Sequence, residues 1–432
     1  MSRLFFTERG NVLLHNNEEI TRWRWAKKQF TLPAEAARGP AELWLMLGCY
    51  PDNAAPLTVE INGRHTAEIA PTGEKVPDYW TWCPVSVPAG VLREGANEVL
   101  LRSDNPTMNG WMLAIDNTAA SSRSYVSNDR GQTWRNKRLG AHNALRGEYV
   151  IRLRANGESL REHRPPRVVL ENPEHPRVRE LREIVPASVR EESDPWQQVL
   201  ALRAWVAQQW THDGSGPAYA PWDPWTVLDW SQRNGGHGRK GKVTFCVHFS
   251  TTFVALVTAL GHKARCLAIT RDVAGPAGHF VCEVFDQRHG KWVLHDANCD
   301  GHYELDGVPL AGPDIMERAR RGEDCTPLSH TGEGMVNAAP HVRSAWERSF
   351  ATGYSYLNMA VWAHNNYVSD PTSAPPNHGS VKYCETDFVW YTPSEESRRA
   401  VAMFPYRVAS RGWFDRAPKG TGRRVAAAQA AG

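Results

Sequence analysis

Cys246 is the residue whose type and position best suit covalent chemistry. It opens a run that ends at Gly261, in which apolar residues recur at steps of three and four, the period of one helix face. Valine and threonine in the run favour a strand, but its length and period predict a buried helix from about Cys246 to Leu260, which glycine can end without strain. A cysteine in a first helical turn faces unpaired N–H groups and the positive end of the helix dipole, which favour the nucleophilic thiolate. The alternative is a small core residue.

His279 and Asp296 lie on two segments that are predicted to form a β-hairpin. The turn Gln287–Gly290 joins the segments, so we expect Asp286 to pair with Lys291. Side chains alternate along a strand, and with this register Asp296 is a diagonal neighbour of His279 on one face, about 7–8 Å away. A turn one residue longer or shorter would place the two side chains on opposite faces.

Together, Cys246, His279 and Asp296 supply the groups that nucleophilic acyl transfer requires. The thiolate attacks a carbonyl carbon, and His279 exchanges protons with the nucleophile and the leaving group. Asp296 orients the imidazole and stabilises its cation. Backbone N–H groups at the start of the helix can stabilise the developing oxyanion. We therefore predict a catalytic site formed by these three residues.

Metal binding is the competing interpretation of the neighbouring residues. The run Asp296–Gly301 (Asp-Ala-Asn-Cys-Asp-Gly) resembles the start of a calcium loop, but Gly307 stands where the bidentate glutamate would be. His295, His302 and Cys299 are further potential ligands, although their spacing matches no strong template. No Cys-x-x-Cys pair occurs among the 8 cysteines, which argues against a structural zinc site. We expect neither a metal nor another cofactor.

A segment rich in Trp, Gly and His, residues 217–242, leads into Cys246. We predict a long loop, and a loop of this length inside a domain usually binds a ligand or covers a site. Tryptophan rings stack on the apolar faces of sugars, so Trp222, Trp225, Trp230 and His237 are the predicted substrate-binding residues. Core packing is the alternative, and it accounts for most of the 18 tryptophans.

Several shorter patterns predict the elements around this centre. Asp194 is followed by Pro-Trp-Gln, which predicts an N-capped helix ending near Trp210. A further helix is predicted over Asp314–Arg320 and a strand over Phe388–Tyr391. The polar run 364–378 suits either a ligand pocket or a solvated loop.

Residues 1–155 read as an antiparallel β-sandwich of the jelly-roll kind. Alternating segments at 42–47, 57–61 and 98–102 are separated by turn signals such as Asn-Gly and Asn-Pro. The run Ser127–Trp134 fits the Asp-box pattern Ser-x-Asp-x-Gly-x-Thr-Trp, which we interpret as a structural hairpin turn.

The predicted fold class is α+β, with the sandwich followed by a second, catalytic domain. Residues 156–193 are rich in Pro, Arg and Glu and are predicted to be a linker. Residues 194–415 form the predicted catalytic domain. The Ala-, Gly- and Arg-rich tail 416–432 is predicted to be disordered.

Composition narrows the range of partners. Charged residues make up 22%, hydrophobic residues 41%, and the net charge is only +3, with no Lys/Arg run that would indicate nucleic-acid binding. No apolar run is long enough for a membrane span, and the N-terminus lacks a signal sequence. We expect a cytoplasmic protein without nucleic-acid or membrane partners, or a secreted one if a signal has been removed; the oligomeric state stays open.

The motifs around the three predicted catalytic residues resemble the core of the transglutaminase-like superfamily. They are Gly241-x-x-x-x-Cys246, then Ala-Leu-Gly-His-Lys-Ala-Arg265, His279-Phe-Val-x-Glu-Val-Phe and Gly290-Lys-Trp-x-x-x-Asp296, and they span about residues 195–305. The resemblance implies a papain-like α+β fold with a Cys-His-Asp site, as in transglutaminases, bacterial cysteine proteases and amidases, and peptide:N-glycanases. Two departures stand out: Asp296 is followed by Ala-Asn rather than Pro, and the segment before Cys246 is long. The N-terminal strands likewise resemble the galactose-binding-like sandwiches of carbohydrate-active enzymes.

The leading hypothesis is a cysteine hydrolase or acyl transferase that acts on an amide-type bond through a thioester. The sandwich and the Trp-rich segment suggest a glycan, glycoconjugate or peptide substrate. One alternative is glycosidic cleavage in the same cleft, with His279, Asp296 or Glu283 as acid or base. Another is a glycan-binding protein without catalytic activity.

Overall fold

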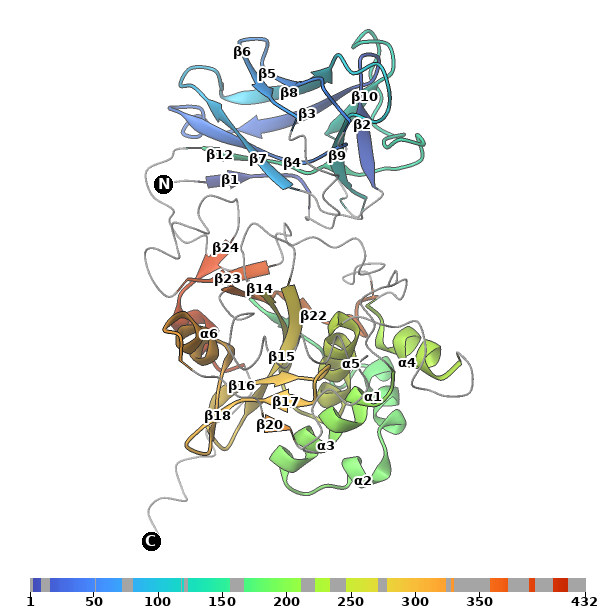
Figure 1. Ribbon diagram of the computed structural model, residues 1–432, viewed down its shortest axis with the longest axis vertical. Coiled ribbons are helices and arrows are strands. Elements are labelled where there is room, and N and C mark those ends of the chain that lie inside the picture. The colour runs from blue at the N-terminus through green and yellow to red at the C-terminus, as the bar shows by residue number, and fades with distance from the viewer. Residues whose placement is uncertain are drawn as a thin grey trace. The chain divides into compact units, whose positions relative to one another are not determined.

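The computed structural model describes residues 3–8, 16–50, 52–71, 81–117, 119, 123–155, 167–210, 222–233, 246–270, 278–323, 328–329, 358–371, 388–392 and 407–418. These residues form two compact units (Figure 1). The first comprises the described residues up to Ala155 together with Arg407, and the second those of 167–371, 388–392 and 408–418. In the described residues, no helix combines the length and the apolar character needed to cross a membrane.

Two antiparallel sheets build the first unit. One contains β1 (Arg3–Phe5), β12 (Ile151–Ala155), β4 (Ala41–Cys49), β9 (Trp111–Asp116) and β11 (Glu148–Tyr149) in that order, with β7 (Thr81–Val87) on β4 and β2 (Asn17–Ile20) on β9. The other follows the order β10 (Ser124–Ser127), β3 (Trp25–Leu32), β8 (Gly95–Ser103), β5 (Leu57–Ile61) and β6 (His65–Ile69). The predicted strands at 42–47, 57–61 and 98–102 lie in β4, β5 and β8.

Residues from both sheets share one apolar core. Leu43 and Leu45 of β4 pack in the same cluster as Val59 of β5 and Leu101 of β8. Burial alternates along β3 and β8, as expected for strands with one face toward a core. The predicted antiparallel sandwich is therefore confirmed.

The Asp-box run forms the predicted turn. The Asp129 carboxylate accepts hydrogen bonds from the Ser127 hydroxyl at 2.6 Å and the Thr133 amide at 2.9 Å. Bonds from Ser127 and Thr133 lower the pKa of Asp129 to about 2. Gly131 adopts φ +84°, the left-handed conformation that the motif requires of its glycine.

One large sheet runs through the second unit. Its order is β20 (Leu328–Ser329), β17 (Gly301–His302), β16 (Lys291–Asp296), β15 (Gly278–Asp286), β14 (Ala264–Thr270), β21 (Asn358–Trp362), β23 (Phe388–Tyr391) and β24 (Arg407–Ala409). Two short pairs accompany it: β18 (Glu304–Leu305) with β19 (Val308–Pro309), and β13 (Val169–Leu170) parallel to β22 (His364–Asn365). Asp286 pairs with Lys291, so the predicted hairpin register of β15 and β16 is confirmed.

Helices pack on this sheet and on one another. They are α1 (Pro176–Leu181), the 3-10 turn η1 (Arg182–Ile184), α2 (Ala187–Arg190), α3 (Pro195–Ala207), α4 (Pro224–Arg233), α5 (Cys246–Ala259), α6 (Gly312–Arg320) and α9 (Arg411–Phe414). The predicted helices at 246–260, 195–210 and 314–320 correspond to α5, α3 and α6. The side chains of α5 are all buried, and α5 contacts β14, β15, α1, α3 and α4.

The described part of the predicted linker belongs to the second unit. Residues 167–193 form β13, α1, η1 and α2, and Val178 and Leu181 of α1 are fully buried. The Glu171 carboxylate accepts hydrogen bonds from the Val368 and Ser369 amides, nearly 200 positions along the chain. Proline and charge density indicated a connector, but the few apolar side chains of this segment pack on α5 instead.

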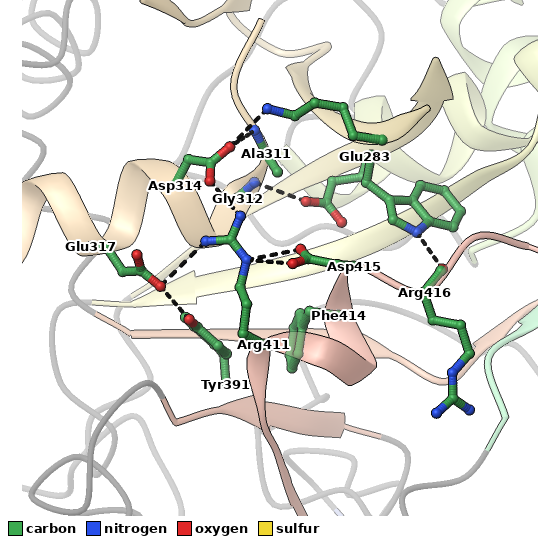
Figure 2. Close-up of polar contacts among 12 residues, drawn as sticks. Glu283, Ala311, Gly312, Asp314, Glu317, Tyr391, Arg411, Phe414, Asp415 and Arg416 are labelled. Atoms are coloured by element: carbon green, nitrogen blue, oxygen red, sulfur yellow. Dashed lines mark hydrogen bonds and ion pairs between the residues drawn. The ribbon is translucent and has the colours of Figure 1, made fainter. Parts of the chain in front are cut away.

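The C-terminal helix α9 is anchored by charge (Figure 2). Arg411 contacts Asp314 and Glu317 of α6 and also Asp415, and Tyr391 of β23 donates to Glu317. These contacts hold α9 against α6 and the sheet. The chain stays packed just beyond, because the Trp292 indole donates to the Arg416 carbonyl at 2.9 Å. The predicted tail 416–432 is thus ordered at its first residues, and positions 419–432 lie outside the described residues.

Candidate active site

Helix α5 places Cys246 at its N-terminus, as predicted. The helix ends at Ala259 and the chain turns at Gly261, which has φ +99° and whose amide donates to the Thr258 carbonyl at 2.8 Å. The Cys246 side chain is 6% exposed, and its sulfur accepts a hydrogen bond from the Phe280 amide of β15 at 3.4 Å. This backbone donor, which no residue type signals in the sequence, stabilises negative charge on the sulfur.

The hairpin brings His279 and Asp296 together. Nε2 of His279 lies 2.7 Å from Oδ2 of Asp296, and both side chains are buried. Their contact follows from the register, since both side chains point to the same face of adjacent strands. The expected carboxylate–imidazole hydrogen bond is present.

A tight turn after β16 holds the carboxylate from its other side. Oδ1 of Asp296 accepts hydrogen bonds from the Asn298 amide at 3.0 Å and the Cys299 amide at 3.1 Å. Aspartate commonly caps the backbone two and three residues ahead in this way, so the Asp-Ala-Asn run itself was the available signal. The turn satisfies the oxygen that His279 does not use.

The three side chains interact electrostatically. Burial disfavours the cation of His279, but the negative charges of Asp296 and Cys246 outweigh burial and raise the pKa of His279 to about 9. For Asp296, burial raises the pKa, but the charge and hydrogen bond of His279 and the hydrogen bonds from the Cys299 side chain and amide lower it by more, so the net shift is downward. The arrangement favours an imidazolium between a carboxylate and a sulfur. With Nε2 bonded to Asp296, Nδ1 is the ring atom that can exchange a proton with Cys246.

Trp222 does not line an open site. Its ring is fully buried and packs on Trp362, with centroids 4.4 Å apart, and on Phe280 at 5.3 Å. A ring enclosed in this way has no face free for a sugar, so the prediction of a substrate contact fails and the core-packing alternative holds for Trp222.

The other predicted substrate-binding residues differ from Trp222. Trp225 and Trp230 are half-buried on α4, a helix within the segment predicted to be an unstructured loop. Pro224 at the start of α4 suits a first helical turn, and the Asp223 carboxylate accepts from the Thr226 amide at 3.2 Å, which stabilises this start. His237 lies outside the described residues, as do residues 241–245, which precede Cys246 in the sequence, and residues 271–277, which precede β15.

The calcium interpretation fails because its oxygen ligands are used elsewhere. Asp300 forms a buried ion pair with Arg203 of α3 at 2.9 Å. The same guanidinium lies 3.1 Å from Nδ1 of His295 and 3.1 Å from Nδ1 of His302. His295 and His302 therefore belong to a separate buried cluster, while Cys299 lies with His279 and Asp296.

Two cavities of the second unit are lined by other residues. One of about 290 Å³ has Trp196, His262 and His295 among its lining residues. The other, of about 480 Å³, has Lys263, Trp292 and Trp413 among its own. Neither is lined by Cys246, His279 or Asp296. The candidate site is identified by its hydrogen bonds.

Comparison with known proteins gives a family match over one region of the chain. Residues 182–297 match the family model described as the transglutaminase-like superfamily. A solved structure titled "Xyl-CBM35 in complex with glucuronic acid containing disaccharide" is 23% identical over 26% of this chain and 68% of that chain, with a TM-score of 0.15. A search of curated proteins finds no match.

The matched region contains α3 to α5, β14, β15 and β16, and with them all three predicted catalytic residues. Its topology, a buried helix that begins at a cysteine and is followed by a strand pair with His and Asp, is the one expected from the motifs. The family supports a cysteine-based catalytic activity in general terms. The second unit of this chain therefore contains a domain of the transglutaminase-like superfamily.

Proposed function

We propose that this protein is a cysteine-dependent hydrolase or acyl transferase that acts on an amide-type bond through a thioester. The observation that carries the proposal is the position of His279, hydrogen-bonded to Asp296 at 2.7 Å and interacting with Cys246. A nucleophile, a proton carrier and an orienting carboxylate in this order are what acyl transfer requires.

In the first half-reaction, the Cys246 thiolate attacks the carbonyl carbon and a tetrahedral oxyanion forms. N–H groups at the start of α5 are suited to stabilise it. The His279 imidazolium then donates its Nδ1 proton to the departing nitrogen, the C–N bond breaks, and a thioester of Cys246 remains. Because the pKa of His279 is about 9, the imidazole carries this proton at neutral pH.

The second half-reaction regenerates the thiolate. His279, now neutral, removes a proton from water in a hydrolase or from an amine in a transferase, and this nucleophile attacks the thioester carbon. The C–S bond breaks and the product carboxylate or amide leaves. Asp296 keeps the imidazole oriented and stabilises its cation in both halves.

For the substrate, we propose a peptide or a glycan-bearing conjugate. The half-buried rings of Trp225 and Trp230 on α4 support a contact with sugar or aromatic groups. The rival glycosidic chemistry needs a free acid or base, and Glu283 does not offer one. It is fully buried, paired with Arg265, and accepts from the Gly312 amide at 2.8 Å (Figure 2). Glu283 is therefore suited to join β14, β15 and α6 rather than to move protons.

A mass-spectrometric screen over peptides, glycopeptides and oligosaccharides tests the proposal. Wild-type protein should cleave or transfer at an amide-type bond, and Cys246→Ala should lose turnover while remaining folded. Cys83→Ala in the first unit is the matched control and should stay active, because burial raises the pKa of Cys83 to about 11 and keeps its thiol protonated. Undiminished turnover by Cys246→Ala would refute the assignment of the nucleophile.

Chemical labelling separates the alternatives. Iodoacetamide at neutral pH should modify Cys246 before Cys83 and abolish turnover in step with labelling. Glycosidic cleavage that persists after complete labelling would support the acid–base alternative. Unlabelled Cys246 and no turnover on any substrate would support a binding protein without catalytic activity.

A further inference from the structure

Cys299 is a second thiol beside the candidate catalytic pair. The turn that caps Asp296 brings Cys299 back toward the sheet, so one ligand atom each of Cys299, His279 and Asp296 lies within 4.8 Å of the other two. The three side chains are 6%, 2% and 1% exposed. The proposed acyl transfer does not use this thiol.

The types of the three side chains match a metal that prefers nitrogen and sulfur. A thiolate, an imidazole and a carboxylate are ligands of Zn²⁺, whereas Ca²⁺ takes oxygen ligands only. Once Cys299 loses its proton, Cys299 and Asp296 carry two negative charges, which balance a divalent cation. This balance matters because an uncompensated charge is costly to bury.

The separations allow coordination after small movements. Tetrahedral zinc with bonds of about 2.0–2.3 Å holds its ligand atoms roughly 3.3–3.6 Å apart. His279 Nε2 and Asp296 Oδ2, now 2.7 Å apart, would separate by about 0.6–0.9 Å, within what side-chain rotation allows. The sulfur would close in from at most 4.8 Å. A fourth position stays open for water, as in zinc sites with three protein ligands.

We propose that His279, Asp296 and Cys299 form a site for a single Zn²⁺ ion that reversibly inhibits the enzyme. Binding displaces two protons to solvent, one from the Cys299 thiol and one from Nε2 of the His279 imidazolium, and it breaks the hydrogen bond between His279 and Asp296. The bound imidazole then can no longer be held by Asp296 for proton transfer, so turnover stops until zinc leaves. The inhibition rests on the proposed function; the binding of the ion does not.

Cobalt substitution tests the binding by itself. Co²⁺ added to metal-free full-length protein should bind one ion per chain and give the near-ultraviolet absorption of a sulfur-to-cobalt transition. The band should persist in Cys246→Ala and vanish in Cys299→Ala, with Cys83→Ala as the matched control that keeps it. Cys299→Ser, which preserves the size of the side chain, replaces Cys299→Ala if that variant does not fold.

Zinc titration with a competing chromophoric chelator then measures affinity. We expect the dissociation constant to rise at least about tenfold in Cys299→Ser and in His279→Ala. The site is overturned if wild-type protein binds no ion, if the cobalt band is lost in Cys246→Ala instead, or if Cys299→Ser binds zinc as tightly as wild type. These readouts do not depend on turnover, so they hold even if Cys246 is not the nucleophile.

Measurements of turnover test whether bound zinc inhibits the enzyme. Zinc should inhibit wild-type turnover and EDTA should restore it. The turnover of Cys299→Ser, compared with its own rate without zinc, should resist zinc at least about tenfold better than wild type does. Loss of activity on treatment with EDTA alone would mean that the metal is required, and would overturn an inhibitory role.

Discussion

His279 is the residue through which the other two are connected. It is buried, yet Asp296 and Cys246 together raise its pKa to about 9, well above the ordinary value near 6.5. An imidazolium that persists through neutral pH is suited to act as the acid toward a leaving amine. The carboxylate of Asp296 supplies much of this effect, so its removal is informative.

Replacing Asp296 by Asn tests the link between the carboxylate and the imidazole. The wild-type profile of kcat/KM should fall on the alkaline side near pH 9, as His279 loses its proton. Asp296→Asn removes the attraction that stabilises the cation, so the alkaline limb should move toward neutral pH and the maximal rate should drop roughly 10²–10⁴-fold.

The control is Asp286→Asn at the turn of the same hairpin, where the carboxylate accepts from the Arg288 amide at 3.0 Å. Its alkaline limb should stay near pH 9. An unchanged limb in Asp296→Asn would show that Asp296 does not set the charge of His279.

Among the helices and strands, α5 contributes most to the candidate site, and its two ends have different structural roles. The N-terminus positions Cys246 against the Phe280 amide, and the C-terminus turns at Gly261 into β14. Glycine makes this turn possible, because it lacks the Cβ atom that makes φ +99° unfavourable for other residues. Stability of this end can be tested without touching the candidate site.

Gly261→Ala should destabilise the protein by about 1–2 kcal/mol, the cost of a left-handed conformation for an L-residue. A Cβ at Gly261 would meet no neighbouring atom within 4 Å, so the cost is conformational rather than steric. Gly412→Ala in α9 also meets no atom but has no positive φ, and should stabilise by about 0.5–1 kcal/mol. Urea unfolding of the two variants should give shifts of opposite sign; a shift of the same sign would contradict the argument.

Helix α4 carries a second test, because Trp222 precedes it and packs in the core. Trp222→Ala should lose about 3–5 kcal/mol of unfolding free energy, the cost of a large buried aromatic side chain. Trp225→Ala should lose clearly less unfolding free energy. It removes a half-buried ring whose indole N–H donates a hydrogen bond to the Arg177 carbonyl at 3.3 Å. Thermal or urea unfolding of both variants decides this. A small loss in Trp222→Ala would restore its candidacy as a substrate contact.

At the scale of the whole molecule, the described residues of each unit form an apolar cluster of their own. The sandwich core and the core beside the large sheet share no residues. Each unit also contains buried titratable groups whose pKa values are shifted by their surroundings, such as Glu18 and Lys28 in the first unit. In the second unit, burial and the charge of Arg203 lower the pKa of His302 to about 4 and lower that of His295 as well.

Stability of the second unit should therefore fall in mild acid. The unfolded chain takes up a proton at His302 near pH 6.5, whereas the folded protein does so only near pH 4. Between these values the unfolded state binds more protons, so the free energy of unfolding decreases as pH falls, by about 3 kcal/mol from this residue.

Calorimetry from pH 7 to pH 4 checks the prediction. His302→Asn, whose side-chain oxygen can accept from Arg203 in place of Nδ1, should flatten the pH dependence of one transition. His142→Asn, at an exposed position of the first unit, should leave the dependence as in wild type. Identical pH profiles for His302→Asn and wild type would contradict the assignment to this cluster.

Patterns that extend over a few neighbouring residues were enough to predict several helices and strands of this protein from its sequence alone. The period of residues 246–260 predicted α5, Gly261 its end, and a four-residue turn the register that joins His279 to Asp296. Asp194 likewise caps α3, accepting from the Trp196 amide at 2.8 Å. Such features depend on neighbouring residues, whose geometry the backbone limits to few choices.

Tertiary structure alone decided which side chains are enclosed and by which distant partners. Trp222 is buried against Trp362, and Arg203 forms an ion pair with Asp300. Residues 167–193 pack into the second unit. The Cys299 thiol comes to lie beside His279 in the same way. These contacts join residues up to about 200 positions apart, and composition and periodicity carry no information about such pairs, because burial depends on the packing of the whole unit.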